Sequence, residues 1–218
     1  MHPTQSPGDG TNASRNAANV AQFPKGNHGA MKRVAILAIS VLLATVAAIG
    51  FLAADQESAS AAGGKVNRCG GGRIFLDAKE KRTFALHNEI RRKHHLPTFC
   101  VHPTLEKAAR DHSQDMIRRD YFSHNTKGRN ETAEKRIKRF GYTPQGYSFY
   151  MIGENIAYGS GSYGEPDSIM NSWMKSDEHR HNILNGKYRE IGIGVSTGTW
   201  QGHDGVSMYT ADFGVRRR

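Results

Sequence analysis

Residues 190–197 alternate large apolar residues with glycine, and this pattern limits how the chain can fold. A period of two is the period of a β-strand, and here one face of the strand has no side chains. The apolar positions are Ile191, Ile193 and Val195, and the glycines are Gly192 and Gly194. Because a bare strand face lets another backbone approach closely, the segment predicts a strand packed directly against a helix or another strand.

Four helices are predicted around this strand from apolar residues at helical spacing. Asp77 and Glu80 form a capping box before the first, Pro103 suits the first turn of the second, and Gly141 suits the end of the third. The predicted helices span residues 78–93, 103–119 and 132–140, and the fourth begins at Pro166 and includes Trp173. A polar loop carrying His179 and His181 is expected after the fourth helix.

Two further strands are predicted, a short one within residues 151–157 and another at residues 206–215. The second would pair with the glycine-containing strand through a Gly-rich turn, and both carry apolar residues on each face. Such a sheet is covered on both sides by helices, so the sequence predicts an α/β fold in three layers. We expect one folded domain at residues 73–215, preceded by a flexible Ala, Gly and Ser-rich linker at residues 56–72.

An apolar run of 21 residues, 34–54, follows Met31-Lys32-Arg33 and is long enough to cross a bilayer. Positive charge before the run and none directly after it predicts export of everything downstream. Residues 31–55 are therefore interpreted as a signal peptide or a signal anchor, and the sequence leaves both open. Residues 1–30 are a disordered tail or a mis-assigned start. We expect an extracellular or cell-surface protein, exported through residues 34–54.

The chain carries 30 lysines and arginines against 20 acidic residues, a formal net charge of +10. Such a balance favours polyanionic partners, and export argues against nucleic acid. The basic runs are interpreted first as solvated faces, and binding to anionic lipid or wall polymer is the alternative. They are Arg91-Arg92-Lys93, Lys135 to Arg139, and Arg216-Arg217-Arg218.

The two cysteines, Cys69 and Cys100, both lie downstream of the export segment. In an oxidising compartment two such thiols are more often a disulfide than a reactive pair. We therefore expect a disulfide between them.

Familiar nucleophile and phosphate-binding motifs are absent from the sequence, but loop histidines and a carboxylate remain as candidates for chemistry. His124, Glu154 and His179 could bind zinc or another divalent metal, with a water completing the shell. A lone loop histidine is usually a surface residue, and Glu154 could equally be a buried, hydrogen-bonded carboxylate. His112, on an apolar helix face, is expected to be a core histidine.

Five ordered motifs resemble the CAP superfamily of cysteine-rich secretory, antigen 5 and pathogenesis-related 1 proteins, in particular its bacterial SCP-like secreted branch. The motifs are Leu86-His87-Asn88-Glu89-Ile90-Arg91, Tyr121-Phe122-Ser123-His124, Gly153-Glu154-Asn155-Ile156-Ala157, Trp173-x-x-Ser176-x-x-His179-Arg180-x-Asn182-Ile183-Leu184, and Glu190-Ile191-Gly192-Ile193-Gly194. This resemblance implies a single-domain α-β-α sandwich with a mainly antiparallel central sheet.

The resemblance also implies a central cleft where two histidines and two acids meet. His124 and His179 match the histidines, and Glu154 of Gly-Glu-Asn, with Asn155 beside it, matches the first acid. Ser176 stands where the eukaryotic pattern has the second acid, although Asp177 and Glu178 are near. The implied site is a ligand cleft in which His124 and His179 hold a metal.

Three functional hypotheses follow. The leading one is a secreted or membrane-anchored, non-enzymatic binding module at the cell envelope, with a metal, a lipid or sterol, or a cell-wall component as its ligand. The alternative is a metal-assisted hydrolase of peptide or wall polymer, with Glu154 as the general base. In the third, the cleft is a structural network of buried polar groups.

Overall fold

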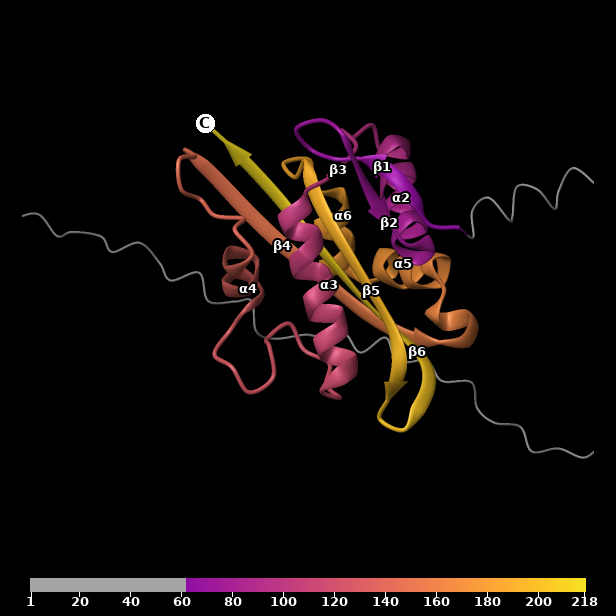
Figure 1. Cartoon of the computed structure of the whole chain (residues 1–218). Helices are drawn as coiled ribbons and strands as arrows, with labels where there is room; N and C mark the ends of the chain where they lie inside the picture. The colour runs from indigo at the N-terminus through magenta and orange to yellow at the C-terminus, as the bar shows by residue number, and fades with distance from the viewer. Residues whose placement is uncertain (1–61) are drawn as a thin grey trace, which may run out of the picture.

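A four-stranded sheet forms the middle layer of the molecule (Figure 1). The computed structural model describes residues 62–218, so the predicted tail, the export segment and the start of the linker lie outside the described residues. The strands are β3 (Cys100–Val101), β4 (Phe149–Ser160), β5 (Glu190–Trp200) and β6 (His203–Arg217), in the order β3-β5-β6-β4. All pairs are antiparallel except β3 with β5.

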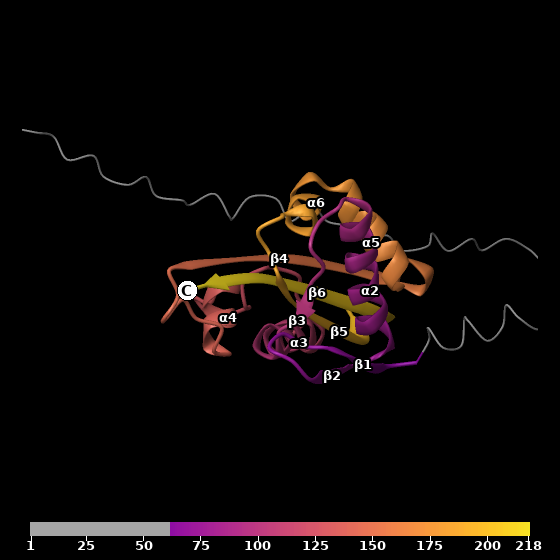
Figure 2. The same ribbon diagram turned by 90° about the horizontal axis from the view of Figure 1, so that it is seen from above.

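Helices cover both faces of this sheet (Figure 2). Helices α2 (Ala78–Lys93), α5 (Pro166–Lys175) and α6 (Asp177–Leu184) lie on one face, and Leu86, Trp173 and Ile183 pack there against Phe213 of β6. Helices α3 (Pro103–Arg118) and α4 (Ala133–Arg139) lie on the other, with Leu105, Ala108 and Ile137 in one cluster. A short 3-10 helix, η1 (Gly161–Gly164), joins β4 to α5. The predicted three-layer sandwich with a mainly antiparallel sheet is confirmed.

The glycine pattern in β5 allows α3 to lie directly on the sheet. A Cβ atom on Gly192 would lie 2.1 Å from the carbonyl carbon of Leu105, and one on Gly194 would lie 2.2 Å from that of Ala109. Both distances are far below van der Waals contact, so no side chain fits at either position. The predicted close approach is therefore confirmed, and the approaching element is a helix.

Three expectations about local structure need correction. The polar loop expected around His179 and His181 is the helix α6, whose apolar Ile183 is buried in the core. The linker expected through Gly72 already contains β1 (Gly64–Asn67), which pairs with β2 (Arg73–Leu76). Strand β4 runs over 149–160, well beyond the short strand predicted within residues 151–157, because it pairs with β6 over its whole length.

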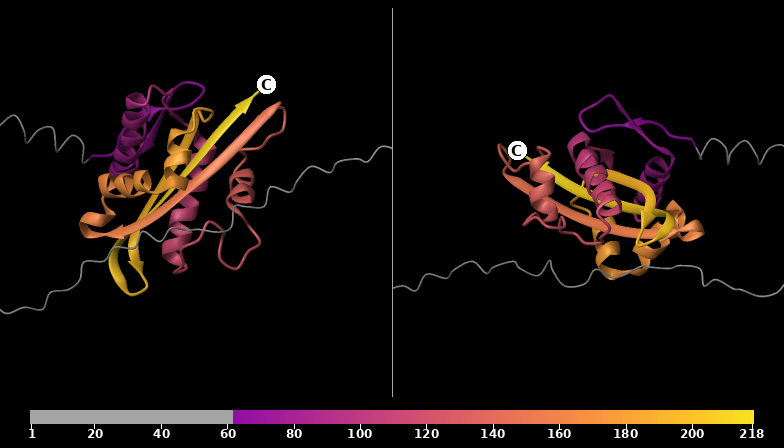
Figure 3. Two further views of the ribbon diagram at one scale, coloured as in Figure 1. Left: turned by 180° about the vertical axis from the view of Figure 1, so that it is seen from behind. Right: turned by 60° about the horizontal axis from the view of Figure 1, so that its bottom comes forward.

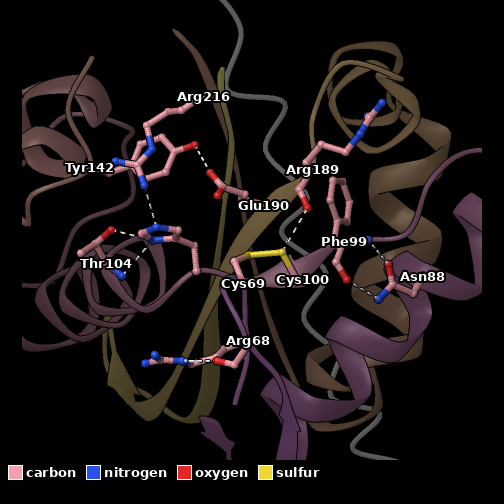
Figure 4. Close-up of a disulfide and its surroundings, with 12 residues drawn as sticks. Arg68, Cys69, Asn88, Phe99, Cys100, Thr104, Tyr142, Arg189, Glu190 and Arg216 are labelled. Atoms are coloured by element: carbon pink, nitrogen blue, oxygen red, sulfur yellow. Dashed lines mark hydrogen bonds between the residues drawn. A yellow bond between two sulfur atoms is a disulfide. The ribbon is translucent and has the colours of Figure 1, made fainter. Parts of the chain in front are cut away.

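The disulfide between Cys69 and Cys100 is present, as predicted (Figure 4). It joins the connection between β1 and β2 to β3, and the amide of Cys69 donates to the carbonyl of Val101 at 2.9 Å. Beside it, the Asn88 side chain of α2 accepts from the amide of Phe99 at 2.7 Å and donates to the Phe99 carbonyl at 3.1 Å. The disulfide thus holds β3 to the connection between β1 and β2, and the Asn88 hydrogen bonds hold the residue before β3 to α2.

Among residues 62–218, no helix is both long and apolar enough to cross a membrane.

Candidate functional site

The Gly153-Glu154-Asn155 motif lies in β4, the border strand of the sheet, and its residues alternate between the two faces. Gly153 makes room for Tyr188, whose hydroxyl oxygen would lie 2.5 Å from a Cβ atom there. Glu154 points toward α3 and α4, whereas Asn155 points toward α6 and donates to the carbonyl of His179 at 3.0 Å. The motif therefore connects the two helical layers through one strand.

Both carboxylate oxygens of Glu154 are engaged. His124, in the loop after α3, donates from Nδ1 to Oε1 at 2.7 Å, and Arg136 of α4 donates from Nη2 to Oε2. Arg136 also donates to the carbonyl of His124 at 3.1 Å, which fixes the loop as well as the ring. The Glu154 and Arg136 side chains are 3% and 1% exposed, while that of His124 is 32% exposed. Only the histidine of this trio reaches the surface.

Charge pairing keeps Glu154 ionised in the interior. Burial opposes ionisation, but the Arg136 guanidinium and the hydrogen bond from His124 outweigh it and hold the pKa of Glu154 well below its usual range. With its Nδ1–H held by this carboxylate, a neutral His124 presents Nε2 as its free acceptor. Glu154 thus orients the imidazole and leaves one ring nitrogen for a ligand.

A second acid, Asp212, lies directly opposite Glu154 on β6. Directly paired residues point to the same face of a sheet, so the two carboxyl groups are neighbours beneath α3 and α4. Asp212 is completely buried, and this burial, together with the charge of Glu154, raises its pKa well above the usual range although Arg136 opposes the shift. One arginine therefore faces two buried carboxyl groups, and the raised pKa of Asp212 favours its protonated form over a second buried anion.

His112 of α3 belongs to the same buried group. Its Nε2 donates to the carbonyl of Ser123 at 2.9 Å, which helps to place the loop that carries His124. Burial lowers the pKa of His112 to about 4, so it is neutral at pH 7. The structure confirms that His112 is a core histidine.

His179 reaches the site from the opposite layer, on α6. It is 5% exposed, and its Nδ1 is buried with no hydrogen-bond partner in the described part of the chain. Burial lowers the pKa of His179, and the nearby His124 lowers it further. We call His124 and His179 the imidazole pair: two rings from different layers, close enough to influence each other electrostatically.

The other predicted site residues lie around α6. Ser176 precedes this helix, and its hydroxyl donates to a carboxylate oxygen of Glu178 at 3.1 Å. Asp177 pairs with Arg180 and its side chain is 86% exposed. His181 is exposed. Neither Asp177 nor Glu178 has a hydrogen bond or ion pair with the imidazole pair or with Glu154.

The side chains at the site decide whether the predicted metal ion could bind there. Both oxygens of Glu154 are taken, and within residues 62–218 no three His, Cys, Asp or Glu side chains are placed to hold a metal ion. A site made of His124, His179 and Glu154 together therefore does not fit this arrangement. The histidines alone would supply two nitrogen donors to a zinc or other divalent ion.

Sequence reasoning missed Arg136 and Asp212. Arg136 was assigned with its run to a solvated face, which is wrong, because it is completely buried against Glu154. Its position beside Ile137, also completely buried, was the available signal. Asp212 stands in an apolar strand and belongs to no recognised motif, so only the register of β4 with β6 reveals it.

The fold and the site define a class: an α-β-α sandwich whose border strand presents a Gly-Glu-Asn motif between two histidines. A model of the cysteine-rich secretory protein family, CAP, matches residues 84–212. The chain belongs to this family.

Similar proteins are known from several bacteria. The chain is 36% identical over 145 residues to the uncharacterized protein YkwD of Bacillus subtilis, a match spanning 65% of this chain and 53% of that protein. It is 32% identical over 117 residues to the uncharacterized membrane protein YlbC of the same organism, spanning 53% of this chain and 31% of that one. The chain thus spans about half or less of the length of these curated relatives.

Two solved structures share the fold. An extracellular protein containing an SCP domain from Bacillus anthracis has a TM-score of 0.50 and 24% identity, covering 68% of this chain and 47% of that one. An outer surface protein from Borrelia burgdorferi has a TM-score of 0.54 and 22% identity, covering 71% of this chain and 99% of that one. At these identities the likeness establishes the architecture alone.

Proposed function

We propose that this CAP domain is a secreted or cell-surface binding module of the cell envelope, with a ligand held at the imidazole pair. The observation that carries the proposal is the engagement of both Glu154 oxygens by His124 and Arg136. The site then offers a ligand an oriented ring nitrogen of His124 and the neutral ring of His179.

The same observation weighs against a hydrolase that uses Glu154 as its general base. A base works best when its pKa lies near the working pH. The pKa of Glu154 is far lower, because Arg136 and His124 stabilise its anion against the effect of burial. Such a carboxylate has little affinity for the proton of a bound water.

The location of the module rests on its sequence and its relatives. The apolar run at residues 34–54 predicts export, and the two solved structures of the same fold are an extracellular and an outer surface protein. A net charge of +10 favours an anionic envelope. We propose a lipid or sterol, or a cell-wall polymer, as the ligand.

The test is sedimentation of the full-length protein with insoluble peptidoglycan and, separately, with sterol-containing anionic vesicles. Wild type should sediment with one of them, and His124→Ala and His179→Ala should lose most of this binding. His181→Ala is the matched control, because this histidine lies on the same helix as His179 but is exposed. Equal sedimentation of all four proteins, or sedimentation of none, would overturn the proposal.

Metal binding by the imidazole pair is tested by calorimetric titration with Zn²⁺. We expect binding in wild type and His181→Ala, and its loss in His124→Ala and His179→Ala. Retained heat in all variants would remove the pair as a metal site. Peptide or peptidoglycan turnover that disappears in Glu154→Gln would instead favour the hydrolase.

A further inference from the structure

Strand β4 is a border strand of the sheet, with β6 on one side and, within residues 62–218, no strand on the other (Figure 3). In an antiparallel sheet, the backbone groups of successive residues point alternately toward the two sides of a strand. The carbonyl of Ile156 accepts from Trp173 Nε1 at 3.3 Å, and that of Glu154 accepts from Asn182 Nδ2 at 3.4 Å. Even-numbered residues of β4 therefore direct their backbone groups away from β6.

The same alternation directs the N–H and C=O groups of Tyr150 and Ile152 outward. In the described part of the chain, no residue donates to or accepts from these groups, whereas α5 and α6 supply partners at Glu154 and Ile156. An open edge of this kind is a template on which another extended chain can add as a strand.

A groove of about 870 Å³ lies beside this edge, between β4 and α6. Met151 and Leu184 supply its apolar surface, and Arg180, His181 and Lys187 supply polar groups. Its volume lies in the range typical of ligand sites. It lies outside the contacts among Glu154, Arg136 and the imidazole pair, although it shares α6 with His179.

The charges around the groove are predominantly positive. Arg180 pairs with Asp177, so these two side chains balance each other. Lys187 is exposed and forms no ion pair with any residue in 62–218. At the start of β4, the guanidinium of Arg217 lies over the Phe149 ring, 5.2 Å from its centre, and also lacks a carboxylate partner in this part of the chain. One cation thus lines the groove, and another stands at the start of β4.

We propose that an acidic segment of a partner protein adds as a strand to β4 at Tyr150 and Ile152. Its backbone pairs with the outward N–H and C=O groups of these two residues. Its apolar side chains enter the groove over Met151 and Leu184, and its carboxylates lie near Lys187 and Arg217. This surface is a second binding site, separate from the imidazole pair.

The probe is a short, fluorescently labelled peptide that alternates glutamate with valine, titrated into the full-length protein and followed by anisotropy. Two N-methylated forms are compared, one methylated at the glutamates and one at the valines. Strand addition uses the N–H groups of only one set, so one form should lose about tenfold or more in affinity and the other should bind as the parent does. Because the modification is in the peptide, it cannot disturb folding of the protein.

Charge is tested with Lys187→Glu, which should weaken binding of the parent peptide about tenfold at low salt. Lys175→Glu is the matched control and should bind as wild type, because this exposed lysine lies on α5 outside the groove. A counterpart peptide that alternates lysine with valine should not bind. The proposal is overturned if the parent peptide does not bind, if both N-methylated forms bind like the parent, or if the lysine peptide binds equally well. None of these outcomes depends on His124 or His179.

Discussion

Two buried arginines, Arg91 of α2 and Arg136 of α4, come from similar basic runs but have different partners. Both are completely buried. Arg136 pairs with a carboxylate, that of Glu154. Arg91 donates only to backbone carbonyls, namely those of Pro97, Ile183, Asn185 and Tyr188, at 2.7 to 3.0 Å.

The difference in partners gives Arg91 a structural role and Arg136 an electrostatic one. Arg91 fastens the end of α2 to the segment between α6 and β5, and burial lowers its pKa to about 10 because no anion compensates it. Burial also opposes the charge of Arg136, but the Glu154 carboxylate outweighs it and raises its pKa. A buried arginine therefore marks a charged site only where its partner is itself charged.

The largest effect is expected for Arg136→Met, which leaves the Glu154 carboxylate buried without its cation. Breaking a buried ion pair in this way costs about 3–5 kcal/mol in the free energy of unfolding. Urea denaturation at pH 7 measures the loss. Lys135→Met is the control, because the exposed neighbour should change stability by no more than about 0.5 kcal/mol.

The double variant Arg136→Met with Glu154→Gln tests the cause of this loss. Removing the carboxylate's charge should recover a large part of the stability, since the uncompensated anion is the main cost. Strictly additive losses in the double variant would contradict the charge argument.

A smaller effect is expected for Arg91→Met, about 2–3 kcal/mol, because several carbonyls lose a donor but no ion is left unpaired. Arg92→Met, at the exposed neighbouring position, is the control. The measurement is again urea denaturation. Combining Arg91→Met with Glu154→Gln should recover none of the lost stability. A recovery there would contradict the difference proposed between the two arginines.

Much of the fold could be predicted from local signals. The bounds of α2 follow from the capping box at Asp77 and Glu80, which the structure contains, and from apolar residues at helical spacing. The glycines of β5 predicted a close backbone approach, because glycine weakens a strand and is retained there mainly where a neighbouring backbone needs the space. His112 was placed correctly by its position on an apolar helix face.

The missed features depend on tertiary contacts. Helix α6 begins with Asp177-Glu178-His179-Arg180-His181-Asn182, which has no apolar periodicity, and it is held by buried Ile183 and by the Asn155 side chain. Arg91 and Arg136 look solvated in a basic run until their partners are known. The meeting of His124 with Glu154 was predicted through family resemblance, since 30 residues separate them.

The smallest expected effect is a pH dependence of the free energy of unfolding. Groups around Arg136 should cause it, whereas the carbonyls around Arg91 should not. Asp212 has a folded-state pKa raised above its unfolded value of about 4, so its contribution to stability is complete below that value and is lost as pH rises toward the folded pKa. Glu154 stays ionised between pH 5 and pH 7 and adds nothing in this window. Linkage allows at most about 1.4 kcal/mol per pH unit.

Wild type should therefore lose up to about 1.4 kcal/mol relative to Asp212→Asn between pH 5 and pH 6, because the amide mimics the protonated acid and does not titrate. Urea midpoints of both proteins across this range give the comparison. The cost of Arg91→Met should stay constant over the same range, because carbonyls do not titrate. Parallel pH profiles for wild type and Asp212→Asn would mean that Asp212 is ionised in the fold, and Arg136 would then balance two carboxylates instead of one.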